Sequence, residues 1–316
     1  MSLYGVDLGG TKIEGAVIDP SRPDRALCRM RLPTEGAKGY SHILAQITRL
    51  VAMLERESGT RRPACVGFGT PGVIDPLTGV LKNSNTLCLN GQKLREDLAH
   101  ALGTGVAVAN DANCFALAEA KFGAGRGKQV IVGLILGTGC GGGIVVDGRV
   151  LGGLHGIAGE WGHNPLRGER TPCYCGRRGC IETVISGPSL ERYYRGKAQH
   201  ARRMPEIAAR AAKGEAAAKA TLRRLTRKFG EAIAAVINIL DPDAVVIGGG
   251  VGNLDVLYGE ETRRAVLRNV FNTELRTEFL RPLLGDSAGV FGAALLSAAS
   301  KSSGRRAGSP QARRTR

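Results

Sequence analysis

The sequence lacks any run of about 18 apolar residues, the length that a membrane-spanning helix requires. Its first residues, MSLYGVDLGG, also lack the basic and apolar segments of a secretory signal peptide. The sequence therefore predicts no membrane association and a cytoplasmic location, where thiols stay reduced. With 316 residues the chain can bury a substantial core, and its length suggests two domains.

Two common nucleotide-binding motifs are also missing. A dinucleotide-binding fingerprint needs its glycines to open a helix, but GGTKIEGAVID continues as an alternating strand. The nearest approach to a P-loop, GAGRGKQ at 123–129, has Phe122 in place of the first glycine and Gln129 after the lysine. Neither motif is therefore expected to bind a nucleotide here.

Charge alone does not indicate a nucleic-acid partner, although the formal net charge is +16. Residues 301–316 contribute six positive charges, no negative ones and no apolar periodicity, which predicts a disordered basic tail. Arg223, Arg224, Arg227 and Lys228 alternate with apolar residues at helical spacing, which predicts a solvated helix face. No specific nucleic-acid partner is expected, because the tail has no interleaved aromatic residues and a basic surface equally suits an anionic small molecule.

Glycine is abundant, and it gathers in three places that follow predicted strands. YGVDLGGTKIEGAVID (4–19) and LILGTGCGGGIVVDG (134–148) each give a strand, a glycine turn and a second strand. Bare turns of this kind let backbone N–H groups approach a phosphate, and the repeat predicts two related lobes whose turns face a cleft. DPDAVVIGGGV (241–251) follows a helical segment at 221–240 and adds a buried strand that ends in glycines, where open α/β sheets bind ligands. The three clusters together favour a nucleotide.

The eight cysteines divide into two groups. Five are scattered through apolar or glycine-rich segments and are predicted to be small core residues: Cys28, Cys65, Cys88, Cys114 and Cys140. The other three lie in PCYCGRRGC (172–180), as a C-x-C-x4-C cluster formed by Cys173, Cys175 and Cys180.

Three thiolates with one upstream imidazole are the ligand set of a closed structural zinc site. A disulfide is disfavoured in a reducing compartment and would leave one cysteine unpaired; thiols without a metal are the remaining alternative. On spacing alone, His155 and His163 are both candidates for the fourth ligand. Four protein ligands leave no position for a substrate, so the metal is expected to hold the loop rather than to react.

GVAVANDANCFALAEAKFG (105–123) predicts a strand that runs into a helix, with Asn110 or Asp111 as the N-cap. A carboxylate at a helix N-terminus is held rigidly and kept ionised. Such a group can also serve as a general base, so the structural and the catalytic interpretations of Asp111 are compatible.

Six segments in this order resemble the ROK family of sugar kinases and repressors, over roughly residues 3–297: DLGGTK (7–12), NDANC (110–114), LGTGCGGG (136–143), GEWGH (159–163), CYCGRRGCIE (173–182) and DPDAVVIGGG (241–250). The resemblance implies the α/β actin-like or hexokinase-like ATPase fold (ribonuclease H-like), with two lobes around a central cleft. The expected parts are an N-terminal lobe at 1–118, a larger lobe at 119–285 with a zinc loop at 155–182, a C-terminal helix at 286–300 that packs on the first lobe, and the tail at 301–316.

The resemblance also implies the roles of individual residues. Asp7 would bind hydrated Mg²⁺ with ATP, Asp111 would be the general base, and the family motif selects His163 as the fourth ligand of Zn²⁺. The residues implied to bind ATP are Asp7, Gly9, Gly10, Thr11, Lys12, Gly137, Thr138, Gly139, Gly141, Gly249 and Gly250. Those implied to surround the sugar, with Asp111, are Asn85, Asn110, Glu160, His163 and Glu182.

The expected activity is ATP-dependent phosphorylation of a hexose at its 6-hydroxyl. LKNSN (81–85), LNGQ (89–92) and EWGHNPL (160–166) are most similar to the bacterial fructokinase subgroup, so D-fructose is the first candidate. Glucose, mannose and N-acetylhexosamines are the alternatives within the family, and a homodimer is implied by the resemblance. A sugar-responsive repressor would need a helix-turn-helix domain before DLGGTK, which begins at residue 7, and a binding-only pseudokinase is disfavoured because Asp7 and Asp111 are present.

Overall fold

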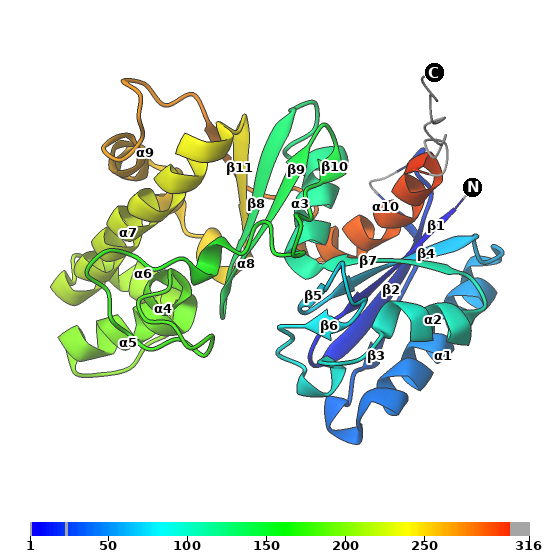
Figure 1. Ribbon diagram of the computed structural model, residues 1–316. Helices are drawn as coiled ribbons and strands as arrows, with labels where there is room; N and C mark the ends of the chain where they lie inside the picture. The colour runs from blue at the N-terminus through cyan, green and yellow to red at the C-terminus, as the bar shows by residue number, and fades with distance from the viewer. Residues whose placement is uncertain (1, 23–24, 304–316) are drawn as a thin grey trace, which may run out of the picture. The chain divides into compact units, whose positions relative to one another are not determined.

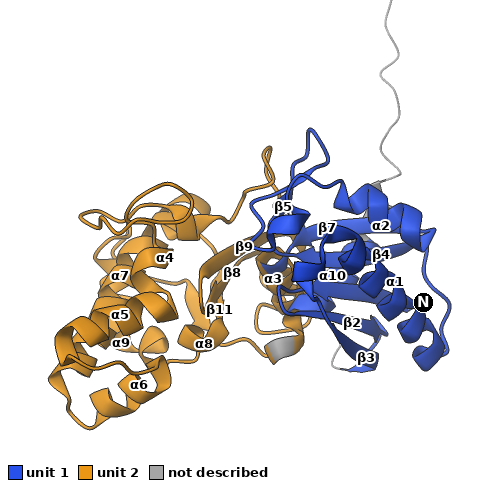
Figure 2. Ribbon diagram, turned by 90° about the horizontal axis from the view of Figure 1, so that it is seen from below, with its two compact units in different colours: residues 1–111, 289–316 blue, residues 112–288 orange. Residues whose placement is uncertain are grey.

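The structure, a computed structural model, describes residues 2–22 and 25–303. They form two compact units, drawn in blue and orange in Figure 2. Unit 1 runs to Asp111 and resumes at Gly289, and unit 2 contains residues 112–288. The division falls at the start of helix α3 (Asp111–Lys121) rather than near residue 118. Helix α3 belongs to unit 2 because it packs closely on that unit's sheet, where a Cβ at Gly133 would lie 2.8 Å from Cα of Ala116.

Unit 1 is built on a five-stranded sheet with the strand order β3-β2-β1-β4-β7. These strands are β1 (Leu3–Leu8), β2 (Lys12–Ile18), β3 (Ala26–Pro33), β4 (Cys65–Thr70) and β7 (Gly105–Asn110). Strands β1, β2 and β3 are antiparallel, whereas β4 and β7 continue the sheet parallel to β1. A separate two-stranded ribbon joins β5 (Val73–Ile74) and β6 (Leu81–Lys82).

Helices cover both faces of the first sheet. A Cβ at Gly15 of β2 would meet Leu50 and Leu54 of α1 (Tyr40–Ser58), whereas Gly5, which faces the other way, touches the backbone of α10 (Ala288–Ser303). Figure 1 shows α10, in red, running beside β1 and β4. The remaining helices of unit 1 are α2 (Leu94–Leu102) and the short 3-10 helices η1 (Gly36–Lys38) and η2 (Leu87–Leu89).

Unit 2 repeats the same sheet, with the order β10-β9-β8-β11-β12. Its strands are β8 (Val130–Leu136), β9 (Cys140–Val146), β10 (Arg149–Val150), β11 (Ala244–Gly248) and β12 (Glu278–Leu280). Again three strands are antiparallel, and β11 and β12 extend the sheet parallel to β8. The two predicted hairpins are therefore confirmed as β1–β2 and β8–β9, and the duplicated topology is the predicted actin-like one.

In unit 2, α7 (Ala216–Leu240) packs against α4 (Glu182–Ile185), α5 (Gly187–Ala198), α6 (Met204–Ala212) and α9 (Glu260–Leu267). Its Leu225, Phe229 and Ile233 are fully buried. The other helices of this unit are α8 (Gly249–Gly252), η3 (Trp161–His163), η4 (Asp255–Tyr258) and η5 (Gly285–Ser287). Within the described part of the chain, no helix combines the length and the apolar character needed to cross a bilayer.

The predicted solvated face on α7 is wrong at two positions. Lys228 is only 5% exposed, and its ammonium lies 3.3 Å from Glu169 and 2.9 Å from Glu231. Arg224 forms an ion pair of 2.7 Å with the same Glu169, and its guanidinium lies over the ring of Tyr193. These cations are covered because the cysteine-containing loop packs on α7, a tertiary contact that helical periodicity does not report.

The predicted basic tail begins at residue 301, but α10 extends to Ser303, and residues 304–316 lie outside the described part of the chain.

Candidate functional site

The first glycine turn, Gly9 to Lys12, joins β1 to β2 in unit 1. The N–H of Gly9 donates to the carbonyl of Lys12 at 3.0 Å, which closes the turn. Buried Thr34, the residue after β3, supports the turn. Its hydroxyl donates to the Gly9 carbonyl at 2.6 Å, and its N–H donates to the Thr11 carbonyl at 3.0 Å. Gly10, Thr11 and Lys12 are exposed, so the tip of the turn is open to a ligand. Thr34 is a supporting residue that the motif did not identify.

Asp7 lies just before this turn, opposite Glu14 on β2. Its pKa is raised to about 7, chiefly by burial and then by the negative charges of Asp111 and Glu14, while Lys12 partly opposes this rise. A Cβ at Gly289 would come within 2.9 Å of its carboxylate, so only glycine leaves this carboxylate its space. Asp7 thus faces more negative than positive charge from the protein, and a hydrated divalent cation fits that imbalance.

Asn110 and Asp111 stand at the junction of β7 and α3. The Asn110 amide donates to the carbonyl of Gly72 at 3.3 Å. Asp111 is the first helical residue and is exposed, and its charge reaches Asp7. The predicted strand-to-helix junction is confirmed, with Asp111 inside the first turn of the helix rather than before it.

Asn85 is exposed in the loop after β6. Its neighbour Ser84 is held by Asn90, whose side chain accepts from the Ser84 N–H at 2.8 Å and donates to the Ser84 carbonyl at 2.9 Å. Thr86 of the same loop reaches the first glycine turn, since a Cβ at Gly10 would lie 3.6 Å from its hydroxyl. The loop of Asn85 therefore lies next to the first glycine turn in unit 1, and Asn90 is the residue that shapes it.

The second glycine turn, Gly137 to Gly139, joins β8 to β9 in unit 2. The Gly137 N–H donates to the Gly139 carbonyl at 3.0 Å, and the Gly187 N–H at the start of α5 donates to the Gly137 carbonyl at 2.8 Å. The carboxylate of Glu182 accepts from the N–H of Cys140 at 3.0 Å. A Cβ at Gly139 would come within 2.4 Å of that carboxylate, so the closeness of Glu182 requires glycine here. Thr138 at the tip of the turn is exposed.

The third glycine cluster lies beside this second turn. Gly249 has φ of 83°, and a Cβ there would lie 2.4 Å from the carbonyl of Leu136, the residue before the turn. Gly250 is exposed, with nothing within 4 Å of the position that a Cβ would take. Gly141, in contrast, lies inside β9, and its carbonyl accepts from the indole N–H of Trp161 at 3.2 Å. That packing role of Gly141 was not predicted.

A pocket of about 610 Å³ opens between the residues that follow α8 and the helices α6 and α7. Its lining combines alanine, leucine and valine side chains with four charged residues. Its lining comprises Ala208, Ala211, Ala212, Lys219, Leu222, Arg223, Asn253, Leu254, Asp255, Val256 and Glu261.

The structure brings the four predicted metal ligands together. The ligand atoms of His163, Cys173, Cys175 and Cys180 all lie within 4.8 Å of one another. Nδ1 of His163 is 3.6 Å from Sγ of Cys173, and the Sγ atoms of Cys175 and Cys180 are 3.6 Å apart. In a tetrahedral site with Zn–S bonds of about 2.3 Å, sulfur ligands would stand about 3.8 Å apart. The donor set and its spacing fit zinc, whereas His155 is not part of the cluster.

Glu160, His163 and Glu182 surround one tyrosine that the motif analysis did not single out. The hydroxyl of Tyr174 lies 3.1 Å from Nε2 of His163, the nitrogen that faces away from the thiols. Although Tyr174 is 80% exposed, partial desolvation of its hydroxyl, with the charges of Glu182, Cys173 and Glu160, raises its pKa to about 12. The phenol therefore stays neutral, and the charges of both carboxylates act on it.

The folds and the glycine turns of both units define a protein of the actin-like ATPase class. The model of the ROK family matches residues 3–300, and the chain belongs to this family. It is 37% identical over 309 residues to the N-acetyl-D-glucosamine kinase of Yersinia pseudotuberculosis serotype O:3 (strain YPIII), covering 94% of this chain and 99% of that one. The corresponding enzyme of Aliivibrio fischeri (strain ATCC 700601 / ES114) is 35% identical over 303 residues, covering 93% of this chain and 98% of that one.

Among solved structures, a ROK hexokinase from Thermus thermophilus is similar with a TM-score of 0.85 and 34% identity, covering 96% of this chain and all of that one. The predicted family and fold class are thereby confirmed, and the chain is a sugar kinase of the ROK family.

Proposed function

We propose that this protein transfers the γ-phosphoryl group of ATP to the 6-hydroxyl of N-acetyl-D-glucosamine. The observation that carries the proposal is the full-length similarity to N-acetyl-D-glucosamine kinases at 35–37% identity. D-Fructose, the first expectation from short motifs, gives way to the N-acetylhexosamine alternative for that reason. A short segment such as LKNSN discriminates poorly between hexoses, because it covers only five residues of the chain.

The glycine turns support the donor half of the proposal. Exposed backbone at Gly10 and at Thr138 gives each unit a set of N–H groups that suits phosphate oxygens. The 610 Å³ pocket beside the residues that follow α8, with alanine and leucine in its lining, suits a flat purine. The excess negative charge around Asp7 suits the Mg²⁺ that accompanies ATP, and that ion would neutralise phosphate charge when bound.

Asp111 supports the acceptor half. As the first residue of α3 it is held by the helix, and as an exposed carboxylate it can accept the proton of the sugar hydroxyl during transfer. Phosphoryl transfer passes through a loose transition state, so correct positioning of the hydroxyl contributes more than strong basicity. Asn85, Asn110, Glu160, His163 and Glu182 are proposed to hold the remaining hydroxyls.

The cysteine cluster is proposed to hold a structural zinc ion, which would supply folding energy to a loop that has little core of its own. Cys180 lies two residues before Glu182, and His163 lies three residues after Glu160, so the cluster fixes the start and the end of the sugar-binding segment. Tyr174 already occupies Nε2 of His163, so a sugar hydroxyl that contacts this imidazole has to share or displace the phenol.

An acetyl group distinguishes the proposed substrate from fructose and glucose, and it needs apolar contact. The segment that leads to Glu160 exposes Leu154 and Ile157, which are 85% and 44% accessible. The carbonyl of Ile157 accepts from the N–H of Glu160 at 3.1 Å, which ties this apolar surface to a proposed sugar ligand. Burial of one methyl group is worth about 0.8 kcal/mol, so Ile157→Ser should lower the preference for N-acetyl-D-glucosamine over glucose about fourfold.

The proposal is tested by measuring ADP release with Mg·ATP and a series of sugars: N-acetyl-D-glucosamine, N-acetyl-D-mannosamine, glucose, mannose and fructose. We expect kcat/KM to be highest for N-acetyl-D-glucosamine, and NMR of the product to place the phosphate on the 6-oxygen. Asp111→Asn serves as the control for contaminating kinases, because it should remove the activity while leaving the fold intact. A higher kcat/KM with fructose would return the assignment to fructokinase.

A further inference from the structure

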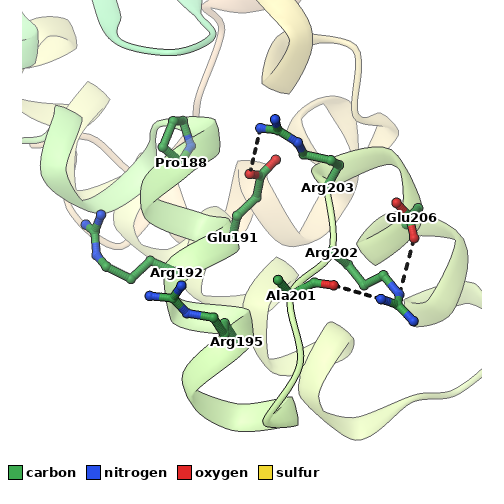
Figure 3. A pocket seen from close by; sticks show the side chains of 8 residues that line it. All are labelled: Pro188, Glu191, Arg192, Arg195, Ala201, Arg202, Arg203 and Glu206. Carbon is green, nitrogen blue, oxygen red and sulfur yellow. Dashed lines mark hydrogen bonds and ion pairs between the residues drawn. The ribbon is translucent and has the colours of Figure 1, made fainter.

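A second concave surface of unit 2 lies between α5 and α6, with a volume of about 520 Å³. Figure 3 shows its lining, in which four guanidinium groups and two carboxylates surround the opening. The lining residues are Pro188, Glu191, Arg192, Arg195, Ala201, Arg202, Arg203 and Glu206. None of these residues belongs to the ATP, sugar or metal sites proposed above.

The arginines of this pocket are only partly neutralised. Arg203 lies 3.3 Å from Glu191, and Arg202 lies 3.3 Å from Glu206. Arg192 and Arg195 lie three residues apart on α5 and so point to the same side of the helix. Neither of them forms an ion pair with a carboxylate in the described part of the chain. The lining therefore carries two positive charges in excess.

The pocket already holds one anionic group of the protein itself. The carboxylate of Glu191 accepts from the N–H of Met204, the first residue of α6, at 3.1 Å, and also from Arg203. A backbone N–H at a helix start and planar guanidinium forks are the donors that bind phosphate oxygens most tightly. The Glu191 carboxylate therefore marks the position of one oxyanion, and Arg192 and Arg195 offer donors for a second.

We propose that this pocket binds a phosphate group, either as free phosphate or as the phosphate of a small ester. Its volume lies within the range of small-molecule sites and exceeds what phosphate alone needs, so a hexose phosphate fits the space beside the arginines. The charge selects a dianion, and the two glutamates of the lining disfavour longer polyanions.

The pocket is connected to the sugar-binding segment through Arg192. Its guanidinium donates to the carbonyl of Thr183 at 3.2 Å and lies 3.2 Å from the hydroxyl of Ser189. That hydroxyl in turn donates to the carbonyl of Glu182 at 3.0 Å. A phosphate that binds Arg192 would draw its guanidinium away from the Thr183 carbonyl and the Ser189 hydroxyl. The backbone at Glu182 and Thr183 would thereby lose part of its support. This consequence rests on the proposed function, and it makes the pocket an inhibitory site that raises KM for the sugar.

Binding is tested by calorimetry on the full-length protein at constant ionic strength, with inorganic phosphate and N-acetyl-D-glucosamine 6-phosphate as separate probes. Arg195→Ala removes an exposed guanidinium from the lining. Lys197→Ala, on the same helix but outside the lining, removes the same charge and serves as the control. We expect affinity to fall at least about tenfold in Arg195→Ala and less than about twofold in Lys197→Ala, because a phosphate–guanidinium contact is local and specific. Tight binding of the ester alone identifies a sugar phosphate as the ligand, and equal binding of both probes identifies free phosphate as sufficient.

The absence of saturable binding to the wild-type protein, or an equal loss in both variants, overturns the site. The connection to Glu182 is tested separately by the KM for sugar at increasing phosphate. KM should rise in the wild type and in Lys197→Ala but not in Arg195→Ala; a rise that is the same in all three overturns the connection. If no sugar is phosphorylated by any of the proteins, the proposed function fails, while the binding measurement still decides on the pocket.

Discussion

Asp7 yields a prediction whose magnitude depends on pH. Its pKa rises from 3.8 to about 7, chiefly because of burial and then because of Asp111 and Glu14. The folded protein thus binds this proton more tightly than the unfolded chain does, so the free energy of unfolding falls as pH rises from about 4 to about 7. A shift of about three units corresponds to about 4 kcal/mol, which partial exposure of the side chain reduces to about 2–4 kcal/mol.

The perturbation is Asp7→Asn, which keeps the shape and removes the titration. In urea unfolding without Mg²⁺, the variant should match the wild type near pH 4 and exceed its stability by about 2–4 kcal/mol at pH 8.5. Asp75→Asn is the control of opposite sign, because the pKa of Asp75 is lowered to about 2 by Lys82 and by the N–H groups of Thr78 and Leu77. That variant should be less stable than the wild type at neutral pH, with the difference vanishing in acid.

Identical pH dependence of stability in the wild type and in Asp7→Asn would refute the reasoning, because it would mean that Asp7 ionises normally. The raised pKa also connects to function, since a cation at Asp7 favours the carboxylate. Binding of Mg·ATP near pH 7 should therefore release a proton in the wild type, and calorimetry in buffers of different ionisation enthalpy detects that release.

Three further predictions concern packing, catalysis and the metal. Gly67→Ala should destabilise unit 1 by at least about 3 kcal/mol, because its Cβ would lie 1.7 Å from the carbonyl of Ala293 on α10. Gly196→Ala lies on the exposed side of α5, where the added Cβ would have no atom within 4 Å, and it should instead stabilise the protein by about 0.5–1 kcal/mol. Thermal unfolding measures both variants. Asp111→Ala should lower kcat at least about 10²-fold with an unchanged circular dichroism spectrum, and near-normal turnover would remove Asp111 from the mechanism. Cys175→Ser should lower zinc content and raise the sugar KM while ATP affinity survives; equal loss of both affinities would mean that the metal supports only global folding.

The fold was largely predictable because its signals are local. The glycine turns at Gly9 and Gly137 separate pairs of alternating strands, so each hairpin is visible within about 15 residues of sequence. The ligand cluster was equally visible, because three of its four members lie within eight positions, from Cys173 to Cys180.

Contacts between distant segments were not predictable from local patterns. Glu182 accepts from the N–H of Cys140, 42 residues away in the sequence, and nothing in either segment indicates that pairing. Helical spacing predicts that Lys228 of α7 lies at the surface. It is buried instead, because the cysteine-containing loop packs on α7 and its Glu169 forms an ion pair with Lys228. Tyr174 was not predicted for the same reason. Its role follows from the tertiary contact of its hydroxyl with His163 and from the charges of Glu160 and Glu182, none of which a local pattern indicates.

The preference for one sugar is measured most directly by competition. The purified protein is given limiting Mg·ATP and an equimolar mixture of N-acetyl-D-glucosamine, glucose and fructose, and the sugar phosphates are quantified by mass spectrometry. Product ratios under these conditions equal the ratios of kcat/KM. We predict that N-acetyl-D-glucosamine 6-phosphate exceeds each other product at least about tenfold, whereas a majority of fructose phosphate, or no sugar phosphate at all, would contradict the proposed function.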